Sequence, residues 1–471
     1  MTGPRIAIVG GGVSGLAAAW ELRRRLGPEA HIQILEAYDR IGGKLKTVDF
    51  SDGPVDMGAE AFLTRRTGLA GVITELGLGD ELRVPSGARS AFLVDGELVD
   101  IPAATMMGVP ARGADVAEVL TPEACAAIDA ERDGAPLPWT PGDDANVGEL
   151  VRQRFTGEVV DRLVSPMLGG VYSSSADDLG VRATIPQLAD ALDNLADRGE
   201  DVHLSTAVQQ VLDERAAASA SASGDGTPGP AFNTLATGYR TLVNRLAEAS
   251  AADIRVNTQV ESIGHLTDRI YLEPVGRVDA VIVAVPAPTA SVLLQDIVPS
   301  AAEILDEVKL ASSAVVGMRF ETTEGLPERS GILIGQDGPT RAKAFTFSSR
   351  KWPHIGERGT GAGAFVRASF GTFHDPSLVE AEDRTLIGYA LEDLAAVTGF
   401  TARPVETFVQ RWWGGLAVYG VGHPAKMDAV RRAVDAAPGV AVAGAYLDGV
   451  GVPACVEAGR AAAEKIVAEL V

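Results

Sequence analysis

The sequence predicts an α/β fold in which a Rossmann-like domain is interleaved along the chain with an α+β domain and a helical subdomain. Three stretches predict it. A strand, a glycine-rich turn and a helix open the chain, a second α/β-like stretch runs from about 253 to 294, and a strand, a glycine-rich loop and a helix close it. Because these pieces lie at the start, the middle and the end, we expect interleaved domains and not domains in series.

The N-terminal stretch predicts a βαβ unit. Residues 5–9 are a short β-branched run, which is typical of a buried strand. Residues 10–15 interrupt that run, and residues 14–26 follow with helical periodicity, which a Gly-Pro pair stops. Residues 31–36 are again strand-like, so strand, helix and strand follow one another directly.

The rest of the chain predicts elements of different character. "DIRVNTQVESIG", "RIYLEPVG" and "DAVIVAVPAP" look like successive strands. Residues 110–200 are rich in Ala, Asp and Leu and are expected to be mostly helical, whereas alternating runs such as "AVVGMRF" and "AFVRASF" within 310–413 indicate an antiparallel sheet. The stretch "DERAAASASASGDGTPGPA" at 213–231 is low in complexity and is expected to be a mobile surface loop.

These elements place the expected domain boundaries. The segments are, in chain order, Rossmann-like 1–85, α+β 86–109, helical 110–200, α+β with the low-complexity loop 201–231, Rossmann-like 232–300, α+β 301–413 and Rossmann-like 414–471.

Charge and composition exclude several classes of partner. The chain of 471 residues is long enough for two or three domains, and its formal charge is 41 − 63 = −22. A surface this acidic repels nucleic acid and anionic membranes, so neither is an expected partner. An acidic ligand would need bases gathered locally at its site.

The cysteines, the histidines and the N-terminus exclude further classes. Cys125 and Cys455 are the only cysteines and give neither a disulfide framework nor a zinc site, and the six histidines lack ligand spacing, so no metal is expected. No apolar run reaches the roughly 18 residues of a membrane span, and the glycine-broken N-terminus lacks a basic leader region. We therefore expect a cytoplasmic protein.

A dinucleotide fingerprint lies between the first strand and the first helix. Gly10 permits the tight turn, Gly12 lets the backbone approach a pyrophosphate, and Gly15 lets helix and strand pack closely. Glu36, at the end of the second strand and 36 − 15 = 21 residues on, is placed to accept hydrogen bonds from ribose hydroxyls. The nucleotide-binding residues predicted here are Gly10, Gly11, Gly12, Val13, Ser14, Gly15, Glu36 and Ala37.

A second glycine-rich stretch follows the ribose carboxylate in "ILEAYDRIGGKLKT". Gly42 and Gly43 allow a loop to pass close to the same diphosphate, which Arg40 and Lys44 would neutralise. Other motifs fail: "GVSGL" lacks the last glycine of a hydrolase elbow, and "GGKL" lacks the upstream glycine and the hydroxyl of a P-loop. Since no second fingerprint occurs, a nicotinamide cofactor is not expected.

The doublet after the ribose carboxylate resembles FAD-dependent oxidoreductases of the flavin amine oxidase type, a superfamily with the p-hydroxybenzoate hydroxylase-like arrangement of an FAD-binding and a substrate domain. "PVDMGAEAFL" resembles the loop that contacts the flavin, and "NTQVESI" resembles the segment that meets the adenine. "GAYLDGVGVPACVEAGRAAAEKI" resembles the second flavin motif, at a helix N-terminus under the flavin ring. The resemblance implies FAD as cofactor, with contacts from Gly58, Ala59, Glu60, Ala61, Val260, Val450, Gly451 and Val452.

Three further stretches narrow the resemblance. "SPMLGGVYSSSADDLGVRATIPQL", "FNTLATGYRTLVNRLAE" and "RWWGGLAVYGVGHPAKM" resemble porphyrinogen oxidases of haem biosynthesis, above all the coproporphyrinogen-oxidising kind of Gram-positive bacteria. In that pattern Trp412 lies beside the flavin. Thr237 and Lys44 depart from the usual glycine and arginine, while Gly169, where eukaryotic protoporphyrinogen oxidases tend to carry a base, favours the bacterial branch.

The resemblance implies a chemistry that needs no catalytic side chain. A methylene bridge of a cyclic tetrapyrrole would lose a hydride to flavin N5, and the electrons would pass to oxygen to give hydrogen peroxide, over three two-electron cycles. We expect tetrapyrrole and oxygen as partners, with a possible transient contact to the next haem-pathway enzyme.

The acidic chain must supply local cations for the substrate's propionates, and Arg65 and Arg66, just past the flavin loop, are the candidates. Their alternative role is a solvated helix face. Tyr172, Tyr419 and Tyr446 are candidates to line the substrate pocket, although packing is the commoner role for such residues.

Four alternative functions stay open at this point. A protoporphyrinogen oxidase would share fold and sites, and an amine oxidase would leave the 165–188 stretch unexplained. A carotenoid desaturase should show a more apolar substrate region. A non-catalytic flavin-fold binding protein would have no reason to keep Glu36, the glycine pair and the C-terminal motif together.

Overall fold

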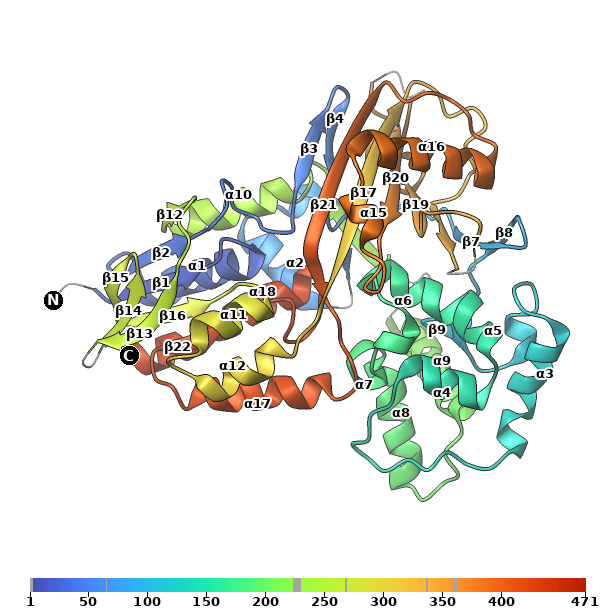
Figure 1. Ribbon diagram of the computed structural model, residues 1–471, viewed down its shortest axis with the longest axis horizontal. Helices are drawn as coiled ribbons and strands as arrows, with labels where there is room; N and C mark the ends of the chain where they lie inside the picture. The colour runs from blue at the N-terminus through green and yellow to red at the C-terminus, as the bar shows by residue number, and fades with distance from the viewer. Residues whose placement is uncertain (1–2, 65, 223–229, 267–268, 336–337, 360–362) are drawn as a thin grey trace. The chain divides into compact units, whose positions relative to one another are not determined.

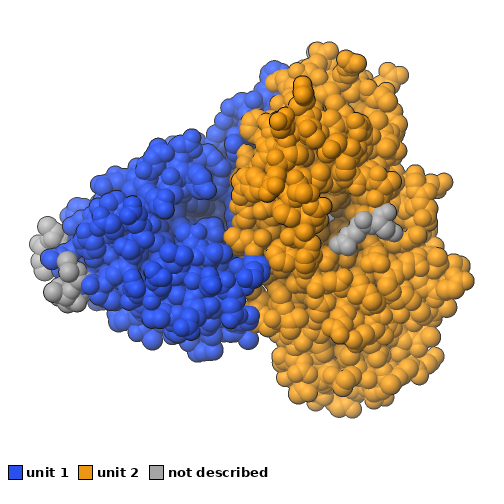
Figure 2. Space-filling model, in the orientation of Figure 1, with its two compact units in different colours: residues 1–84, 231–309, 424–471 blue, residues 85–230, 310–423 orange. Residues whose placement is uncertain are grey.

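The computed structural model describes residues 3–64, 66–222, 230–266, 269–335, 338–359 and 363–471. It divides into two compact units, coloured separately in Figure 2. Unit 1 comprises residues 1–84, 231–309 and 424–471, and unit 2 comprises residues 85–230 and 310–423. Both units are therefore assembled from separate segments of the chain.

A parallel sheet forms the centre of unit 1. Its strands lie in the order β12-β2-β1-β16-β22, so the first strand of the chain is flanked by strands from the N-terminal and the middle segments. Ile8 pairs with Ile34 on one side and Ile282 on the other, and all three are fully buried. Parallel sheets are covered on both faces, which explains the near-continuous apolar runs in these strands. The strands are β1 (Arg5–Val9), β2 (His31–Leu35), β12 (Asp253–Arg255), β16 (Ala280–Val283) and β22 (Val440–Val442).

Helices from all three segments complete unit 1 (Figure 1). The first and last helices pack directly on one another, since a Cβ on Gly459 of α18 would overlap the backbone of Ser14 in α1. Buried Glu21 of α1 accepts hydrogen bonds from Arg24, Arg25 and Arg460, which ties the two helices together. The helices are α1 (Val13–Leu26), α2 (Thr67–Glu75), α10 (Tyr239–Ser250), α11 (Ala287–Leu294), α12 (Pro299–Asp306), α17 (His423–Asp435) and α18 (Val452–Leu470).

Smaller sheets surround the parallel one. The stretch 253–264 was predicted as one strand, but the chain leaves the parallel sheet after β12 and enters a separate antiparallel sheet at β13. Between them, the backbone N–H groups of Asn257 and Thr258 donate to Tyr38 O and Glu36 O, outside the strand pairing that ends at Arg255. The further strands are β3 (Thr47–Phe50), β4 (Gly53–Asp56), β5 (Phe62–Leu63), β6 (Leu82–Arg83), β11 (Phe232–Leu235), β13 (Ser262–Leu266), β14 (Arg269–Glu273) and β15 (Gly276–Val278).

A larger sheet forms one half of unit 2, in the order β21-β17-β20-β19-β18-β7-β8. The antiparallel pairing predicted for 310–413 is confirmed for β17, β19, β20 and β21, while β18 and β7 pair in parallel. β21 continues past the expected boundary at 413, because Ala417 still pairs with Leu310. The strands are β7 (Ser90–Val94), β8 (Glu97–Asp100), β17 (Leu310–Phe320), β18 (Gly331–Ile334), β19 (Ala344–Phe347), β20 (Ala364–Phe370) and β21 (Glu406–Ala417).

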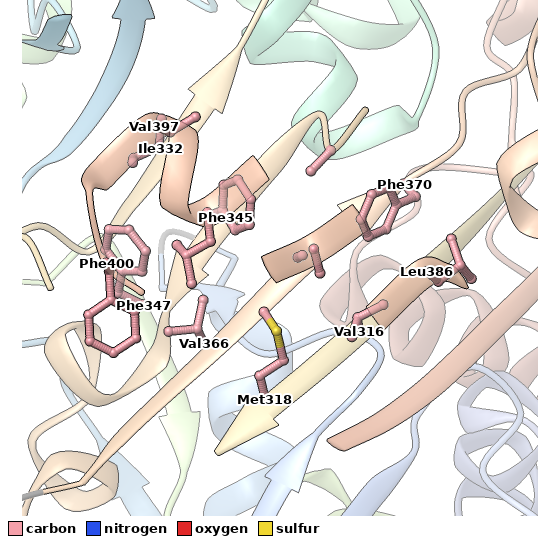
Figure 3. Close-up of a cluster of buried hydrophobic side chains, with 14 of the residues drawn as sticks. Val316, Met318, Ile332, Phe345, Phe347, Val366, Phe370, Leu386, Val397 and Phe400 are labelled. Carbon is pink, nitrogen blue, oxygen red and sulfur yellow. The ribbon is translucent and has the colours of Figure 1, made fainter. Parts of the chain in front are cut away.

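One face of this sheet carries the core of unit 2. Alternate residues of β17, β18, β19 and β20 point into a cluster that α16 (Asp383–Thr398) covers, and Figure 3 shows Val316 of β17 and Phe345 of β19 with Leu386 of α16. This alternation is the two-residue period of a strand with one buried face. Short helices border the sheet: α13 (Ser348–Lys351), α14 (Pro353–Gly356) and α15 (Ser377–Glu380).

The other half of unit 2 is mostly helical, as predicted for 110–200. A short hairpin of β9 (Thr105–Met106) and β10 (Val109–Pro110) leads into it. Its helices are α3 (Pro122–Ala130), α4 (Val147–Arg154), α5 (Gly157–Val159), α6 (Ser165–Tyr172), α7 (Val181–Thr184), α8 (Pro186–Asp197) and α9 (Leu204–Ala222). In the described part of the chain, no helix combines the length and the apolarity that crossing a bilayer requires.

The prediction of a surface loop at 213–231 was wrong for its first part. α9 continues to Ala222, so residues 213–222 are helical. Alanine has the highest helix propensity of all residues, and the Ala-rich run extends a helix whose earlier residues, such as Val208 and Val211, are anchored in the core. Residues 223–229 of this loop lie outside the described residues.

Candidate functional site

The turn between β1 and α1 has the geometry that its glycines predict. Gly10 has a φ of 107°, and a Cβ there would lie 2.5 Å from the carbonyl oxygen of Ala284. A Cβ on Gly15 would overlap the carbonyl oxygen of Gly10. A Cβ on Gly12, in contrast, would meet no described atom within 4 Å. Gly10 and Gly15 are therefore needed by the fold itself, whereas Gly12 leaves space above the turn that a ligand can use.

The N-terminus of α1 opens into this space. Its N-cap is Gly12, so no side chain satisfies the first backbone N–H groups, those of Val13, Ser14 and Gly15. Free N–H groups at a helix N-terminus, together with the helix dipole, favour a bound anion. The predicted fingerprint residues are thus brought together in an arrangement suited to a diphosphate.

Glu36 is held beside the turn by two backbone groups. Gly11 donates its N–H to Oε2 over 2.7 Å, and Tyr38 donates its N–H to Oε1 over 2.9 Å. The side chain is buried, with 8% of its surface exposed. A carboxylate offers about four acceptor positions, so these two bonds fix its orientation and leave others for a ligand's hydroxyl groups.

The segment that leads to Val260 runs alongside Glu36. The backbone N–H of Glu36 bonds to Arg255 O over 2.9 Å, and Thr258 N–H bonds to Glu36 O over 2.8 Å. Val260 follows two residues later and is buried. Ala37 lies between the two bonded residues Glu36 and Tyr38. The residues expected at the ribose and the adenine are therefore neighbours, and their contacts with a nucleotide stay a prediction.

Arg40 acts on the glycine pair in a way that the sequence did not predict. Its guanidinium donates to the carbonyl oxygens of Ile41, Gly43 and Leu45, over 3.2, 2.6 and 3.0 Å. Burial lowers the pKa of this guanidinium. Arg40 therefore braces the loop from within, and its predicted role of neutralising a diphosphate stays a prediction.

The glycine loop approaches the fingerprint turn closely. Gly42 donates its N–H to Gly11 O over 2.8 Å, and a Cβ on Gly43 would lie 3.1 Å from Gly12 Cα. Gly43 has a φ of 55°. The two glycine-rich stretches thus border the same open space at Gly12, as the spacing of the motif indicated.

Lys44, Ser14 and Cys455 meet where the glycine loop, α1 and α18 come together. Burial raises the pKa of the Cys455 thiol to about 11, while Lys44 and a hydrogen bond with Ser14 act in the opposite direction. Burial also lowers the pKa of Lys44. Cys455 therefore stays a neutral thiol near pH 7 and offers no nucleophile.

The loop with Gly58, Ala59, Glu60 and Ala61 joins β4 to β5. Thr234 Oγ1 donates to Glu60 O over 2.6 Å, and the two oxygens of Asp56 accept the N–H of Tyr239. The loop is thus fastened at both ends to the segment 232–239.

Tyr239 is a residue that the sequence analysis missed. Its side chain is fully buried, and its Oη has no hydrogen-bond partner among the described residues. Burial, with Asp56 and Glu60 nearby, raises its pKa well above the ordinary value, so the phenol stays a neutral donor. A buried hydroxyl without an acceptor is rare in folded proteins and makes Tyr239 a candidate to donate to a ligand. Its place in the "LATGYRTL" stretch was the available signal.

The C-terminal motif places a second uncapped helix N-terminus in unit 1. α18 begins at Val452 with Gly451 as its N-cap and no side-chain cap. Arg66 donates to Asp448 O over 3.2 Å and pairs with Glu457 over 3.4 Å, so it borders this motif from outside. Val450 lies in the bend that enters the helix. A role for Arg66 toward substrate stays a prediction, and Arg65 lies outside the described residues.

The remaining predicted residues belong to different places. Tyr446 lies in unit 1 and is buried, and burial raises its pKa. In unit 2, the rings of Tyr172 and Tyr419 are 5.9 Å apart, and the Tyr419 ring stacks on His423 at 4.1 Å. Trp412 lies on β21 opposite Ser313. The structure thus brings Tyr172 and Tyr419 together, and the expected position of Trp412 beside a flavin stays a prediction.

The residues of unit 1 fit a bound dinucleotide. Two uncapped helix N-termini, an oriented and buried carboxylate, open space at Gly12 and the buried hydroxyl of Tyr239 supply donors and acceptors that the described residues leave unused. Each is of a kind that phosphates, ribose hydroxyls or a flavin ring can satisfy.

Known proteins resemble the chain over nearly its whole length. The coproporphyrinogen III oxidase of Mycobacterium tuberculosis H37Rv is 39% identical over 466 residues, which cover 98% of this chain and 97% of that protein. The protein of the same name from Bacillus subtilis 168 is 30% identical, covering 97% of this chain and 96% of its own. A crystal structure from Exiguobacterium sp. 255-15, which carries the provisional name protoporphyrinogen oxidase, matches with a TM-score of 0.85 at 29% identity and covers 100% of both chains.

These findings confirm the predicted fold class and the predicted resemblance to porphyrinogen oxidases. The family described as flavin containing amine oxidoreductase matches residues 13–467, which is most of the chain. The chain belongs to the flavin containing amine oxidoreductase family.

Proposed function

We propose that the chain is a coproporphyrinogen III oxidase that binds FAD. It converts coproporphyrinogen III to coproporphyrin III, with oxygen as electron acceptor and hydrogen peroxide as second product. The observation that carries the proposal is the dinucleotide cradle of unit 1, in which Gly11 and Tyr38 orient Glu36 beside the space at Gly12. The names of relatives that are 30–39% identical over almost the full chain support the substrate.

The overall reaction removes six hydrogens from the macrocycle. Each of three rounds takes two electrons and two protons from the porphyrinogen and gives them to one oxygen molecule, so three oxygens yield three hydrogen peroxides. Bound FAD would supply the two-electron acceptor between substrate and oxygen. The reaction as proposed requires neither a metal ion nor a side-chain nucleophile from the chain.

The chain's own residues bind and orient. Glu36 would accept the ribose hydroxyls, the N-terminus of α1 would hold the diphosphate, and the N-terminus of α18 would lie under the flavin ring. Tyr239 would donate its buried hydroxyl to the cofactor, since the described residues give it no acceptor. No side-chain base is required of the protein, because bound FAD would supply the hydride acceptor and water would accept the proton.

The contacts with the substrate are likewise proposed. Arg65 and Arg66 are proposed to attract propionates, and Tyr172, Tyr419 and Trp412 are proposed to line the tetrapyrrole's apolar face. The location proposed is the cytoplasm, in the coproporphyrin-dependent route to haem b, with a transient contact to the next enzyme of that route.

The experiment that tests the function is anaerobic mixing of the purified holoprotein with porphyrinogen while the flavin's visible absorbance is followed. Coproporphyrinogen III, protoporphyrinogen IX and a simple amine are added separately. Fast bleaching by coproporphyrinogen III, with porphyrin and hydrogen peroxide formed as air is admitted, is the expected result. Bleaching by protoporphyrinogen IX alone would transfer the protein to the other haem route, and bleaching only by the amine would overturn the assignment.

A further inference from the structure

Lys343 lies in unit 2 immediately before β19, at a place that the sequence analysis did not single out. Its ammonium group donates to Ser173 Oγ over 2.6 Å and to Gly371 O over 2.7 Å. Ser173 ends α6 in the left-handed conformation, with a φ of 54°, and Gly371 follows β20 with a φ of 82°. Three segments that are distant in the sequence thus converge on this one cation.

Among the described residues, the ammonium of Lys343 has no anionic partner. No carboxylate of the described residues forms an ion pair with it, and its two hydrogen-bond acceptors are neutral oxygens. Arg341, two residues earlier, differs in this respect, because it pairs with both Asp393 and Glu392. The described part of unit 2 therefore supplies carboxylates to the exposed Arg341 and none to the enclosed Lys343.

This arrangement is costly unless an anion binds. Protein atoms surround the side chain closely although part of its surface stays accessible, and burial lowers the pKa of Lys343 to about 7. A charge removed from water without a counter-ion destabilises a fold, and a methionine of similar length would avoid that cost. An ammonium group has three donors, and two of them are used here. The third is available to a ligand.

The surroundings of Lys343 indicate what kind of anion fits. Ser173 directly follows Tyr172, whose ring faces Tyr419 at 5.9 Å, and Tyr419 stacks on His423. In α6, the helix that Ser173 ends, the position of Gly170 lies against the side chain of Leu333 in β18. A cation bound to the residue that follows Tyr172, on a segment with aromatic and aliphatic contacts of its own, matches a ligand with a broad apolar body and carboxylates at its edge.

We propose that Lys343 binds a propionate carboxylate of the tetrapyrrole substrate, an inference that rests on the proposed function. Lys343 would replace the water around one propionate, and Ser173 and Gly371 would hold the ammonium in place before the substrate arrives. The inference assigns to unit 2 a charged group that discriminates between porphyrins by their carboxylates, in addition to the arginines proposed in unit 1.

The test compares the binding of coproporphyrin III with that of its tetramethyl ester, which keeps the macrocycle and loses the charges. Binding is measured by quenching of porphyrin fluorescence on the full-length holoprotein. The variants are K343M, K343R and, as a matched control, K426M, which removes a surface lysine that pairs with Glu307. Flavin content and circular dichroism report whether each variant is folded. If K343M does not fold, K343Q takes its place, since its amide keeps donors for the two oxygens.

K343M is expected to weaken coproporphyrin III binding about 10- to 100-fold, the usual worth of a charge-assisted hydrogen bond, and to leave ester binding unchanged. K343R should retain most of the affinity, and K426M should match the wild type. In turnover, K343M should raise KM and alter kcat little. Unchanged coproporphyrin III binding by K343M would overturn the inference alone, because Lys343 would then be structural. A wild-type protein that binds no porphyrin would overturn the proposed function as well.

Discussion

Gly11 and Glu36 are joined by a hydrogen bond of 2.7 Å from the backbone N–H to Oε2, which links the fingerprint turn to the end of the second strand. The same carboxylate accepts the N–H of Tyr38 through its other oxygen, over 2.9 Å. We therefore propose two functions for Glu36: it fixes the turn, and it offers its remaining acceptor positions to a ligand. A glutamine cannot serve both, because one of its two polar atoms is a donor.

E36Q is therefore expected to lower the affinity for FAD about 10- to 100-fold, which corresponds to the loss of one charged hydrogen bond of roughly 1.5–3 kcal/mol. The measurement is a titration of the flavin-free protein with FAD, followed by flavin fluorescence. E29Q, at an exposed position in the same βαβ unit, is the matched control. If E36Q bound FAD as tightly as E29Q, the ribose role of Glu36 would be refuted.

Gly12 and Gly15 lie three residues apart and are expected to respond to alanine in opposite ways. At Gly12 the methyl group meets no described atom within 4 Å and the φ of −71° suits alanine, so the free protein should keep its melting temperature. The methyl group would, however, occupy the space assigned to the diphosphate, so G12A should lose FAD affinity.

G15A should instead destabilise the fold, because its methyl group would overlap the carbonyl oxygen of Gly10. A cost of roughly 1–3 kcal/mol is typical when a side chain is forced into a packed site. Thermal unfolding of both flavin-free variants checks the contrast. An unchanged melting temperature in G15A, or normal FAD binding in G12A, would contradict this account of the turn.

Much of unit 1 could be predicted because its signals are local. Gly10, Gly15 and Glu36 lie within one βαβ unit, and each is tied to a single requirement of that unit: a φ of 107°, close helix–strand packing and a hydrogen-bond acceptor at a strand end. The alternating apolar residues that predicted β17 and β20 are also a signal within a short stretch of sequence. α9 was missed in part because low complexity was given more weight than the helix propensity of alanine.

Lys343 and Tyr239 could not be predicted, because what marks them lies far away in the sequence. Ser173 is 170 positions from Lys343, and Asp56 is 183 positions from Tyr239. Among the described residues, Lys343 has no carboxylate partner and the Tyr239 phenol has no acceptor, and a sequence does not show what surrounds a residue. Arg40 gives a milder example, since its partners are local but its choice of carbonyl oxygens depends on the path of the loop.

Substitutions of Arg40 can distinguish an effect of its positive charge from an effect of its hydrogen-bond geometry. If it acts by neutralising the diphosphate, R40K should keep FAD affinity, since a lysine is also a cation. If it acts as a brace, R40K should resemble R40M, because a lysine cannot reach three carbonyl oxygens with the planar fork of an arginine.

The structure favours the role of Arg40 in holding the loop. Both R40K and R40M are therefore expected to lower the free energy of unfolding by roughly 1–3 kcal/mol. The two variants are also expected to lose FAD affinity to a similar extent. Urea unfolding and FAD titration on the two variants provide the measurement. A wild-type affinity in R40K combined with a large loss in R40M would favour the electrostatic role instead.

Lys343 should make the stability of the ligand-free protein depend on pH. Its pKa in the folded chain is about 7, below its ordinary value of 10.5, because burial disfavours the charged form. Between these values the unfolded chain binds one more proton than the folded chain, so the free energy of unfolding should rise with pH. The slope for one group is at most about 1.4 kcal/mol per pH unit, and below pH 7 the penalty of the buried charge is present in full.

K343M removes the group, so the difference in unfolding free energy between K343M and the wild type should be largest near pH 6 and shrink toward pH 10. Urea unfolding of both proteins across this range tests it, and a difference that stays constant with pH would show that Lys343 keeps its ordinary pKa.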